Sequence, residues 1–363
     1  MDKVFIKTFG CQSNYGDSET LAGLLYNKGF QIVNDLNEAN LVIVNSCGVK
    51  GITQNRVLSF VNSISKTKKV YVGGCLTSMI NIEKYCKDIT GHFNTNSIIK
   101  FSDILKEKEK IKIYSREKES RILKPVIRKD QELAIMNISQ GCLNNCSFCS
   151  TKLSRGILRS YEVKDIVKAV EDSVKSGCKK IYLSSQDNGC YGLDIGTNLP
   201  SLLKEIVKIP GNFEVRVGMG NPRFLPRFLD ELIEVYKNDK VMKFLHIPIQ
   251  SGSNKILKEM KRGNTVEDFI KIIKVFRKEI PGMSIATDII IGYPTETEED
   301  FQETLKLIDD IKPEVLNISK YGKRPGTFAA GLKQLPSQEI KRRSLILTKK
   351  YKEIRKILFN LAD

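Results

Sequence analysis

The sequence predicts an α/β protein with two domains, an open parallel sheet followed by an incomplete (β/α) barrel of six units. Short apolar runs alternate with amphipathic runs from the start of the chain, which is the βαβ rhythm of a parallel sheet. A charged stretch interrupts this alternation, which then resumes for about 200 residues, as six βα units require. The length of 363 residues suffices for two domains of about 100–200 residues each.

The first domain is predicted from four strand-like runs with helices between them. These runs are Val4–Phe9, Gln31–Val33, Leu41–Val44 and Lys69–Val72. In the first helix we expect Asp17 to be the N-cap, because Leu21, Leu24 and Leu25 follow it on one face. Gly29 is expected to end this helix.

The charged stretch Phe101–Asp130 predicts a domain boundary. It holds ten Lys or Arg and six Asp or Glu residues and shows little sustained periodicity. Such a composition is typical of a mobile, solvated connector, and its positive charge also suits contact with a phosphate backbone.

The second domain is predicted from six further strands with helices between them. The strands are Leu133–Ser139, Lys180–Ser184, Phe213–Gly218, Phe244–Pro248, Ile285–Ile291 and Val315–Ser319, with helices such as Val163–Ser176 and Glu299–Ile311. In a (β/α) barrel the chemistry belongs to the loops that follow the strands.

Three cysteines stand in the loop after the first of these strands, at Cys142, Cys146 and Cys149. Three thiolates so close together can ligate three irons of a cluster, which leaves the fourth iron open. An open coordination position distinguishes catalytic metal sites from structural ones. The alternative is a structural zinc site, which requires four ligands, and neither a second cysteine pair nor a His-x-x-x-His motif follows here.

Three other cysteines occupy equivalent positions in the first domain, because Cys11, Cys47 and Cys75 each follow a predicted strand. The carboxyl ends of parallel strands share one edge of a sheet, so these three thiols can converge on a second metal or cluster site. Taken singly, each is also compatible with a small buried apolar residue. Cys86, Cys178 and Cys190 have no such placement and are interpreted as packing or loop residues.

Polar residues follow other strands of the predicted barrel. They lie in the runs Ser184–Asp187, Gly218–Pro222, Gln250–Ser253 and Gly292–Thr297. Turn formation alone explains most of them, but their shared rim with the cysteine loop makes several of them candidate ligand contacts. The two histidines are too few for a histidine metal site.

The composition predicts a cytoplasmic protein with a polyanionic partner. An excess of 59 Lys and Arg over 42 Asp and Glu gives a net charge of +17, which favours nucleic acid, although a lysine-rich background would also explain it. We expect no membrane association, because no run of about 18 apolar residues occurs and the N-terminus leads directly into a strand pattern. The last residues, 336–363, predict a basic helix in which Leu345, Ile346, Ile354, Leu358 and Phe359 form the docking side.

These motifs together resemble the methylthiotransferases of the radical S-adenosylmethionine superfamily. The loop Gly141–Lys152, continuing to Arg155–Tyr161, is similar to their archaeal and eukaryotic tRNA-modifying branch, whose substrate is N6-threonylcarbamoyladenosine. The first domain adds the runs Gly10–Asn14, Asp17–Glu19, Asn45–Cys47 and Gly73–Cys75. The resemblance covers residues 3–330.

The resemblance implies a flavodoxin-like parallel sheet domain at residues 1–118, a linker at 119–132, a partial (β/α)6 TIM-like radical S-adenosylmethionine barrel at 133–335 and a basic C-terminal helix at 336–363. It implies two [4Fe–4S] clusters. Cys142, Cys146 and Cys149 would hold the cluster that binds and cleaves S-adenosylmethionine, and Cys11, Cys47 and Cys75 an auxiliary cluster that carries the sulfur. Cofactor contacts are expected from Phe148, Ser184, Ser185, Gln186, Asp187, Arg216 and Gln250.

The implied reaction replaces an aromatic C–H bond of a tRNA adenosine by a methylthio group, with tRNA and an electron donor such as a ferredoxin or flavodoxin as partners. Alternatives are a methylthiotransferase for isopentenyladenosine or for a ribosomal protein side chain, and a non-catalytic iron–sulfur protein that binds RNA or transfers electrons. Family members usually carry a small RNA-binding barrel (TRAM) after the radical domain, and the roughly 25–30 residues that follow it here are too few for one. We therefore expect the basic helix, the charged stretch or a separate RNA-binding protein to replace it.

Overall fold

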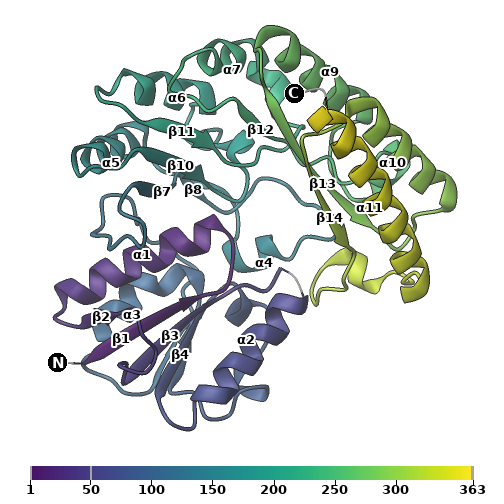
Figure 1. The fold of residues 1–363 in the computed structure, drawn as a ribbon. Coiled ribbons are helices and arrows are strands. Elements are labelled where there is room, and N and C mark those ends of the chain that lie inside the picture. Colours follow the sequence, from purple (N-terminus) through teal and green to yellow (C-terminus); the bar gives the residue numbers. More distant parts are fainter. Residues whose placement is uncertain (1, 50, 361–363) are drawn as a thin grey trace. The chain divides into compact units, whose positions relative to one another are not determined.

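The computed structural model describes residues 2–49 and 51–360, which form two compact units (Figure 1). The first unit comprises the chain up to Cys142 together with Ser150–Gln186. The second comprises Leu143–Cys149 and the chain from Asp187 onward. The domain boundaries given above stay a prediction.

A six-stranded parallel sheet forms the centre of the first unit. Its strand order is β2-β1-β3-β4-β5-β6, which is the flavodoxin-like order extended by one strand. The strands are β1 (Lys3–Thr8), β2 (Gln31–Val33), β3 (Leu41–Ser46), β4 (Lys69–Gly74), β5 (Gly91–Phe93) and β6 (Ile111–Ile113). The predicted open parallel sheet is therefore confirmed, with two more strands than the sequence indicated.

Helices cover both faces of this sheet: α1 (Gln12–Asn27), α2 (Gly51–Ile64) and α3 (Ile98–Ile104). Successive residues of β3 point to opposite faces, as in any strand. Ile43 packs with Leu25 of α1 and Phe101 of α3, whereas Val44 packs with residues of α2. The buried Cys86 joins the core on the α2 side, in agreement with the packing role predicted for it.

Two predictions about the first unit are wrong. Asp17 is not the N-cap of α1, because the helix begins at Gln12 and its N-cap residue is Cys11. The stretch from Phe101 to Asp130 is not a connector throughout, because it contributes most of α3 and the edge strand β6. In both places a polar sequence is folded against the sheet domain.

The first unit continues with β7 (Leu133–Asn137), β8 (Ser139–Gln140), α4 (Thr151–Arg155), β9 (Arg159–Ser160), α5 (Val163–Lys175) and β10 (Lys180–Ser184). The strands β7 and β10 pair in parallel, with Leu133 opposite Lys180 and Asn137 opposite Ser184. The short strands β8 and β9 pair antiparallel. Helix α1 packs against β7, so the start of the predicted barrel and the sheet domain share this unit.

The second unit contains β11 (Glu214–Val217), β12 (Phe244–His246), β13 (Ser284–Ile291) and β14 (Val315–Lys320). Its helices are α6 (Leu199–Lys208), α7 (Leu229–Tyr236), α8 (Asn254–Glu259), α9 (Val266–Glu279), α10 (Glu298–Ile311) and α11 (Ser337–Asn360). The strands β12, β13 and β14 form a parallel sheet. Capping boxes fix the starts of α9 and α10, where Thr265 and Thr297 cap the helices reciprocally with Asp268 and Asp300.

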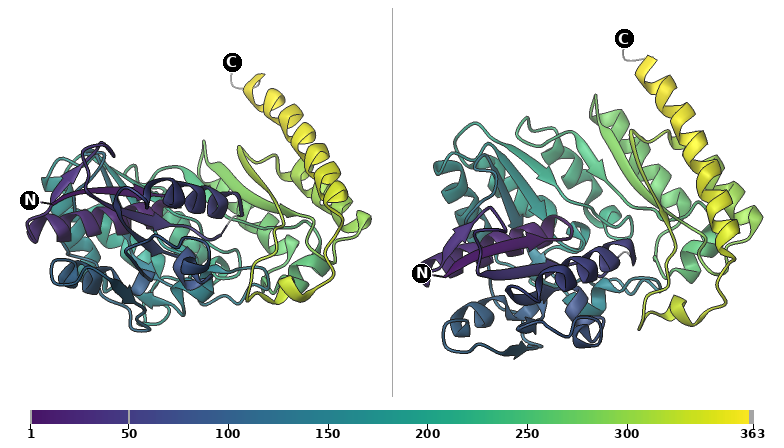
Figure 2. Two further views of the ribbon diagram at one scale, coloured as in Figure 1. Left: turned by 90° about the horizontal axis from the view of Figure 1, so that it is seen from below. Right: turned by 60° about the horizontal axis from the view of Figure 1, so that its bottom comes forward.

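Helix α11 confirms the predicted C-terminal helix, although residues 361–363 lie outside the described residues. It packs on β14 and α10, and its C-terminal turns (yellow) run past the neighbouring elements of the unit (Figure 2). The predicted docking side is partly wrong: Leu345 and Ile346 are exposed, whereas Ile354 is buried as predicted. Arg343 and Leu347, which were not predicted to dock, are buried. The predicted side chains of Leu358 and Phe359 lie outside the described ones. Among the described residues no helix has the length and apolar character of a membrane span.

Candidate functional site

Three cysteines of the first unit gather at the carboxyl edge of its sheet, as the sequence predicted. Cys11, Cys47 and Cys75 directly follow or lie close beyond β1, β3 and β4. Burial, together with negative charge on Cys75 and Cys11, raises the pKa of the Cys47 thiol to about 11. The three sulfur atoms are therefore close enough to interact electrostatically. Positive charge on Arg155 acts in the opposite direction.

The backbone around these cysteines is tightly packed. Gly74 has a left-handed φ of 95°, and a Cβ atom there would lie 2.4 Å from the carbonyl oxygen of Ser46. The Cys75 N–H donates to the same carbonyl over 2.8 Å. On the other side, the Cys11 thiol donates to Asn14 Oδ1 over 3.3 Å, and Asn14 Nδ2 donates to Asn45 Oδ1. The ends of neighbouring strands are thus locked together beside the thiols.

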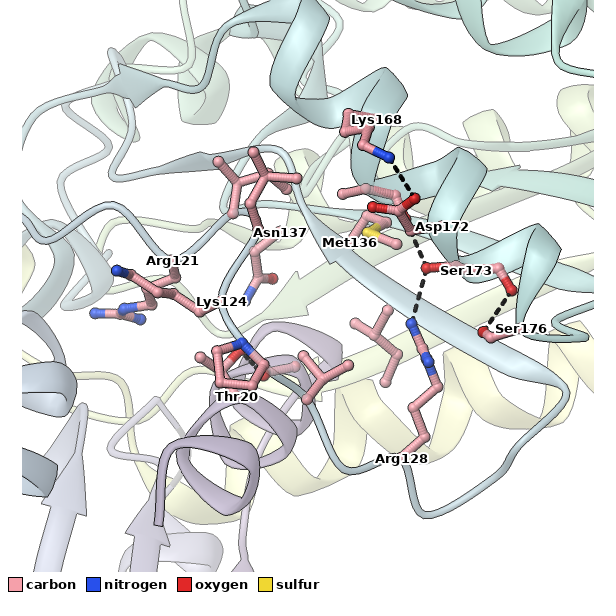
Figure 3. A pocket seen from close by; sticks show the side chains of 17 residues that line it. Thr20, Arg121, Lys124, Arg128, Met136, Asn137, Lys168, Asp172, Ser173 and Ser176 are labelled. Atoms are coloured by element: carbon pink, nitrogen blue, oxygen red, sulfur yellow. Dashed lines mark hydrogen bonds and ion pairs between the residues drawn. The ribbon is translucent and has the colours of Figure 1, made fainter. Parts of the chain in front are cut away.

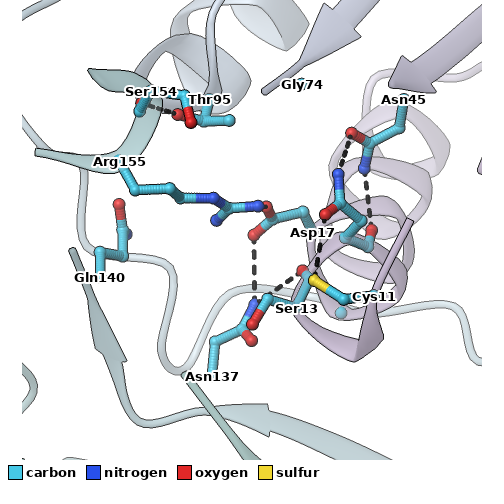
Figure 4. A network of polar contacts seen from close by, with 12 residues as sticks. Cys11, Ser13, Asp17, Asn45, Gly74, Thr95, Asn137, Gln140, Ser154 and Arg155 are labelled. Atoms are coloured by element: carbon cyan, nitrogen blue, oxygen red, sulfur yellow. Dashed lines mark hydrogen bonds and ion pairs between the residues drawn. The ribbon is translucent and has the colours of Figure 1, made fainter. Parts of the chain in front are cut away.

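A buried arginine from another part of the unit extends its guanidinium toward Asp17 in the neighbourhood of Cys11 (Figure 4). Arg155, the last residue of α4, is 2% exposed and hydrogen-bonds to Cys75. Its Nη2 atom lies 2.8 Å from Oδ2 of Asp17, which is 1% exposed. The other carboxylate oxygen of Asp17 accepts from Arg121 Nη1 and, over 3.2 Å, from Asn137 Nδ2. Arg121 also donates to the carbonyl oxygen of Thr95.

The second group of cysteines lies on the loop between β8 and α4. Cys142, Cys146 and Cys149 are each half-buried, and none of them is in a disulfide. The Cys142 N–H donates to the carbonyl oxygen of Gly156 over 3.2 Å. The Cys149 N–H donates to the carbonyl oxygen of Cys146 over 3.1 Å, which turns this part of the loop back on itself.

Ser147 anchors the middle of this loop within the second unit. Its N–H donates to the Met260 carbonyl over 3.0 Å, and its carbonyl accepts from the Ala329 N–H over 2.9 Å. Its hydroxyl donates to the Glu259 carbonyl over 2.9 Å and lies 2.8 Å from the Tyr293 hydroxyl. The loop is therefore fixed through a residue between two of the cysteines.

A second buried arginine contacts this loop. Arg262 is 4% exposed, and its Nη1 atom donates to Cys146 Sγ over 3.4 Å. Its Nη2 atom donates to the Pro248 carbonyl over 2.5 Å. The neighbouring Phe148 is half-buried and packs against an apolar cluster that contains Ile256 and Tyr293.

The predicted cofactor contacts of the first unit lie beside α1 and the start of the cysteine loop. The Ser184 hydroxyl is buried 2.8 Å from the Ser13 hydroxyl. Gln186 Oε1 accepts from the Gly141 N–H over 2.6 Å, immediately before the first cysteine of the loop. Ser185 lies between them and is half-buried.

The remaining predicted contacts belong to the second unit. The buried Asp187 carboxylate accepts from Asn144 Nδ2 and from the N–H groups of Gly189 and Asn221. Burial raises the pKa of Asp187 to about 6. The Arg216 guanidinium lies 4.7 Å from the ring centre of Phe244. Gln250 follows β12 with a left-handed φ of 82°, a strained conformation for a residue with a side chain.

Both cysteine groups have the donor chemistry that an iron–sulfur cluster requires. Thiolates are the usual cluster ligands, and each group supplies three thiols from short, well-anchored segments. A charge argument supports this fit for the first group. If its thiols were neutral, Asp17 would be the one carboxylate among the described residues that pairs with Arg121 and Arg155, which leaves net positive charge in a buried place. Metal-bound thiolates would balance that charge.

Sequence reasoning missed the arginines and gave Asp17 the wrong role. Arg155 belongs to the run quoted for the family resemblance, and Asp17 to the N-terminal run, but nothing in either run indicates an ion pair. Arg121 lies in the stretch interpreted as a connector, and Arg262 follows α8 in a turn. A basic residue within six positions of a predicted ligand cysteine, as Lys152 and Arg155 are of Cys149, is a signal available in the sequence.

A separate cavity of about 540 Å³ lies in the first unit among α1, β7, α5 and residues 121–128 (Figure 3). Its lining is mostly apolar, with Lys124, Arg128 and Lys168 among its polar residues. Arg128 donates to the Ser173 hydroxyl over 2.8 Å, and Lys168 pairs with Asp172. The Arg128–Ser173 bond holds residues 121–128 against α5, whereas the Lys168–Asp172 pair lies within α5.

Two family models match the chain. The radical SAM superfamily model matches residues 136–308, and the model described as uncharacterized protein family UPF0004 matches residues 3–91. These matches cover the second and the first group of cysteines, respectively.

Relatives with similar sequences span nearly all of the chain. It is 43% identical to the probable threonylcarbamoyladenosine tRNA methylthiotransferase of Pyrococcus horikoshii, over 96% of this chain and 83% of the relative. The protein of that name from Methanocaldococcus jannaschii is 40% identical, over 97% and 83%. The human threonylcarbamoyladenosine tRNA methylthiotransferase is 37% identical, over 96% of this chain and 62% of the human protein.

Solved structures agree on the fold. The radical S-adenosylmethionine methyltransferase TsrM from Kitasatospora setae superposes with a TM-score of 0.67 at 16% identity, over 91% of this chain and 75% of TsrM. The cobalamin-dependent radical enzyme OxsB superposes with a TM-score of 0.62 at 14% identity, over 97% and 56%. The fold is thus a parallel sheet domain combined with a radical S-adenosylmethionine barrel domain. With the sequence relatives, this establishes that the chain belongs to the threonylcarbamoyladenosine tRNA methylthiotransferase family of the radical S-adenosylmethionine superfamily.

Proposed function

We propose that this protein is the tRNA methylthiotransferase that converts N6-threonylcarbamoyladenosine, next to the anticodon, to its 2-methylthio derivative. The observation that carries the proposal is the pair of three-cysteine groups, each held by its own anchored backbone. The names of relatives that are 37–43% identical over nearly the whole chain support the same substrate. The enzyme is a radical S-adenosylmethionine transferase.

The cofactors are S-adenosylmethionine and [4Fe–4S] clusters. When bound, they supply the radical that opens an unactivated C–H bond and the sulfur and methyl groups that replace its hydrogen. In the proposal, Cys142, Cys146 and Cys149 hold the cluster that binds S-adenosylmethionine. The other group, Cys11, Cys47 and Cys75, holds the auxiliary cluster.

The protein's own residues position these groups. Ser147 fixes the cysteine loop to the second unit, and Arg262 places a positive charge against Cys146. Gln186 fixes the start of the same loop through the Gly141 N–H. The proposed S-adenosylmethionine contacts are Phe148, Ser184, Ser185, Gln186, Asp187, Arg216 and Gln250.

The partner is tRNA, and the net charge of +17 suits a polyanion. The basic helix α11 supports the proposal that it contributes to RNA binding, because Lys341, Lys349 and Lys352 lie along it. A ferredoxin or flavodoxin is proposed as the electron donor, and a separate RNA-binding protein as a further partner.

Iron analysis tests the two cluster assignments separately. Anaerobically reconstituted protein should hold about eight irons per chain, since two [4Fe–4S] clusters are proposed. The triple variant Cys11→Ala, Cys47→Ala, Cys75→Ala should hold about four, as should the triple variant at Cys142, Cys146 and Cys149. The matched control Cys86→Ala should keep about eight, because Cys86 is a buried residue of an apolar core cluster. An intact protein that holds only four irons would contradict the proposal.

Nucleoside analysis tests the substrate. In tRNA from a strain that lacks the gene, mass spectrometry should show loss of the 2-methylthio derivative and persistence of the threonylcarbamoyl precursor. The purified enzyme should restore the derivative and release 5′-deoxyadenosine on reduction. An unchanged nucleoside profile would exclude this substrate, and absence of 5′-deoxyadenosine would favour a non-catalytic iron–sulfur protein.

A further inference from the structure

The charged groups behind the first cysteine group form an array of unusual composition. Arg155, Asp17 and Arg121 are 2%, 1% and 5% exposed, so two guanidiniums share one carboxylate in the interior of the unit. Ionised groups are buried at high cost unless they are paired. Among the described residues the array carries an excess of one positive charge, which an anion nearby would balance.

The end of this array that approaches the cysteines is Arg155. It hydrogen-bonds to Cys75 and interacts electrostatically with both Cys75 and Cys11. Arg121, in contrast, is directed to Asp17 and to the Thr95 carbonyl. Both arginines pair with Asp17, but of the two Arg155 is the one that also contacts the cysteine side.

The hydrogen bonding of Arg155 is incomplete. Its Nη2 atom and Asp17 Oδ2 are 2.8 Å apart, yet neither atom completes an aligned hydrogen bond to any described residue. A buried N–H without an aligned acceptor costs free energy that an added acceptor recovers. The Arg155–Asp17 ion pair thus leaves hydrogen-bonding capacity on Nη2, which an anion on the cysteine side could use.

Rigid surroundings keep Arg155 in position. Ser154, the residue before it, accepts from the Thr95 hydroxyl through its carbonyl oxygen over 2.9 Å. Gly156, the residue after it, has a left-handed φ of 70°, accepts from the Cys142 N–H and donates to the Lys152 carbonyl. Hydrogen bonds therefore fix the backbone on both sides of Arg155 and hold its guanidinium in place.

We propose that Arg155 is a positioning residue that gives the Cys11, Cys47 and Cys75 site its affinity for an anionic sulfur ligand of the hydrosulfide class. The proposal rests on the proposed function, in which these thiolates hold an iron cluster with an open position. A cluster with three thiolates already carries negative charge, so binding another anion requires a nearby cation. Charge-assisted hydrogen bonds from arginine provide that compensation with a fixed direction.

The test measures ligand binding at the first cysteine group alone. In the full chain, Cys142, Cys146 and Cys149 are replaced by alanine, so that only the proposed auxiliary cluster is reconstituted. Sodium sulfide and the neutral ligand imidazole are then titrated separately, and changes in the electron paramagnetic resonance of the reduced cluster report binding. The substitutions Arg155→Lys, Arg155→Gln and Arg155→Met are compared with Arg128→Met, which removes an arginine bonded to Ser173 instead of to a cysteine.

The expected result is a loss of binding affinity for hydrosulfide but not for the neutral ligand imidazole. Arg155→Gln and Arg155→Met should weaken hydrosulfide binding by about tenfold, the value of a hydrogen bond to a charged group, while imidazole binding and iron content stay unchanged. Arg155→Lys should retain most of the hydrosulfide affinity, and Arg128→Met all of it. Equal hydrosulfide affinity in the parent and in both neutral variants would overturn the proposal, as would equal losses for hydrosulfide and imidazole.

Two further outcomes are distinguishable. If the neutral variants take up no iron, the lysine variant decides: a retained preference for hydrosulfide over imidazole supports the proposal, and loss of that preference overturns it. If the parent with intact Arg155 binds no iron, the proposed auxiliary site itself fails, which is a separate result from failure of the arginine's role.

Discussion

The buried carboxylate of Asp17 provides the sharpest stability test of the site. The substitution Asp17→Asn keeps the size of the side chain but removes the charge that Arg121 and Arg155 share. Removal of one partner from a buried ion pair costs about 3–5 kcal/mol, because the other charge remains buried and uncompensated. Asparagine retains one acceptor for Arg121, so we expect a loss near the lower end, about 3 kcal/mol.

The assay is thermal unfolding of the iron-free protein, in which no cluster balances the arginines. A loss of about 3 kcal/mol corresponds to a decrease of about 6–12 °C in the midpoint of the transition that reports the first unit. The control Asp172→Asn breaks the exposed pair with Lys168 and should lower the midpoint by less than about 2 °C. If the two variants have equal midpoints, the ion-pair array does not stabilise the fold in the way its burial implies.

Three further predictions concern packing, pH dependence and the cysteine loop. Gly23→Ala should destabilise the protein by about 1–2 kcal/mol despite the higher helix propensity of alanine, because its Cβ would lie 2.3 Å from the Pro125 carbonyl oxygen. Chemical denaturation measures this loss. The control is Gly16→Ala, whose Cβ would meet only atoms at 3.1 Å and beyond. Burial raises the pKa of Glu19 to about 7, so its ionisation destabilises the fold increasingly as the pH rises from 4.5 through 7. The variant Glu19→Gln should therefore have a higher melting temperature than the parent at pH 8 but not at pH 4.5. Ser147→Ala removes the hydroxyl contacts of the loop and should cost about 1–2 kcal/mol in the unfolding of the second unit, whereas an unchanged midpoint would show that its backbone bonds suffice.

The strands of both domains were predictable because their apolar runs are short and regularly spaced. Every predicted strand corresponds to an observed strand whose ends differ by at most two residues. The convergence of Cys11, Cys47 and Cys75 followed from the same pattern, since parallel strands present their carboxyl ends at one edge. The strand β5 (Gly91–Phe93) was missed because its three residues form no apolar run, and β6 (Ile111–Ile113) because it lies within the charged stretch.

The polar interior of the first unit could not be predicted from the sequence. Asp17 looks like a helix cap because leucines follow it, but α1 begins five residues earlier and buries Ser13, Asn14 and Asp17 along with its leucines. A hydrophobic pattern identifies only the face that packs against apolar neighbours, whereas this polar face is buried against Arg121 and Asn137. The partner of each buried charge lies more than a hundred residues away, and no local signal encodes such a pairing.

The position of Arg155 in the chain has a consequence for biogenesis. The three thiols of the sheet domain are synthesised within the first 75 residues, but the guanidinium beside them emerges only after the loop of Cys142–Cys149 has been translated. A nascent or excised fragment of the sheet domain would therefore display its sulfur atoms without their counter-charge. We therefore expect the proposed metal centre to be loaded only after synthesis, and we expect truncated versions of the domain to be unsuitable substitutes for the full chain in spectroscopy.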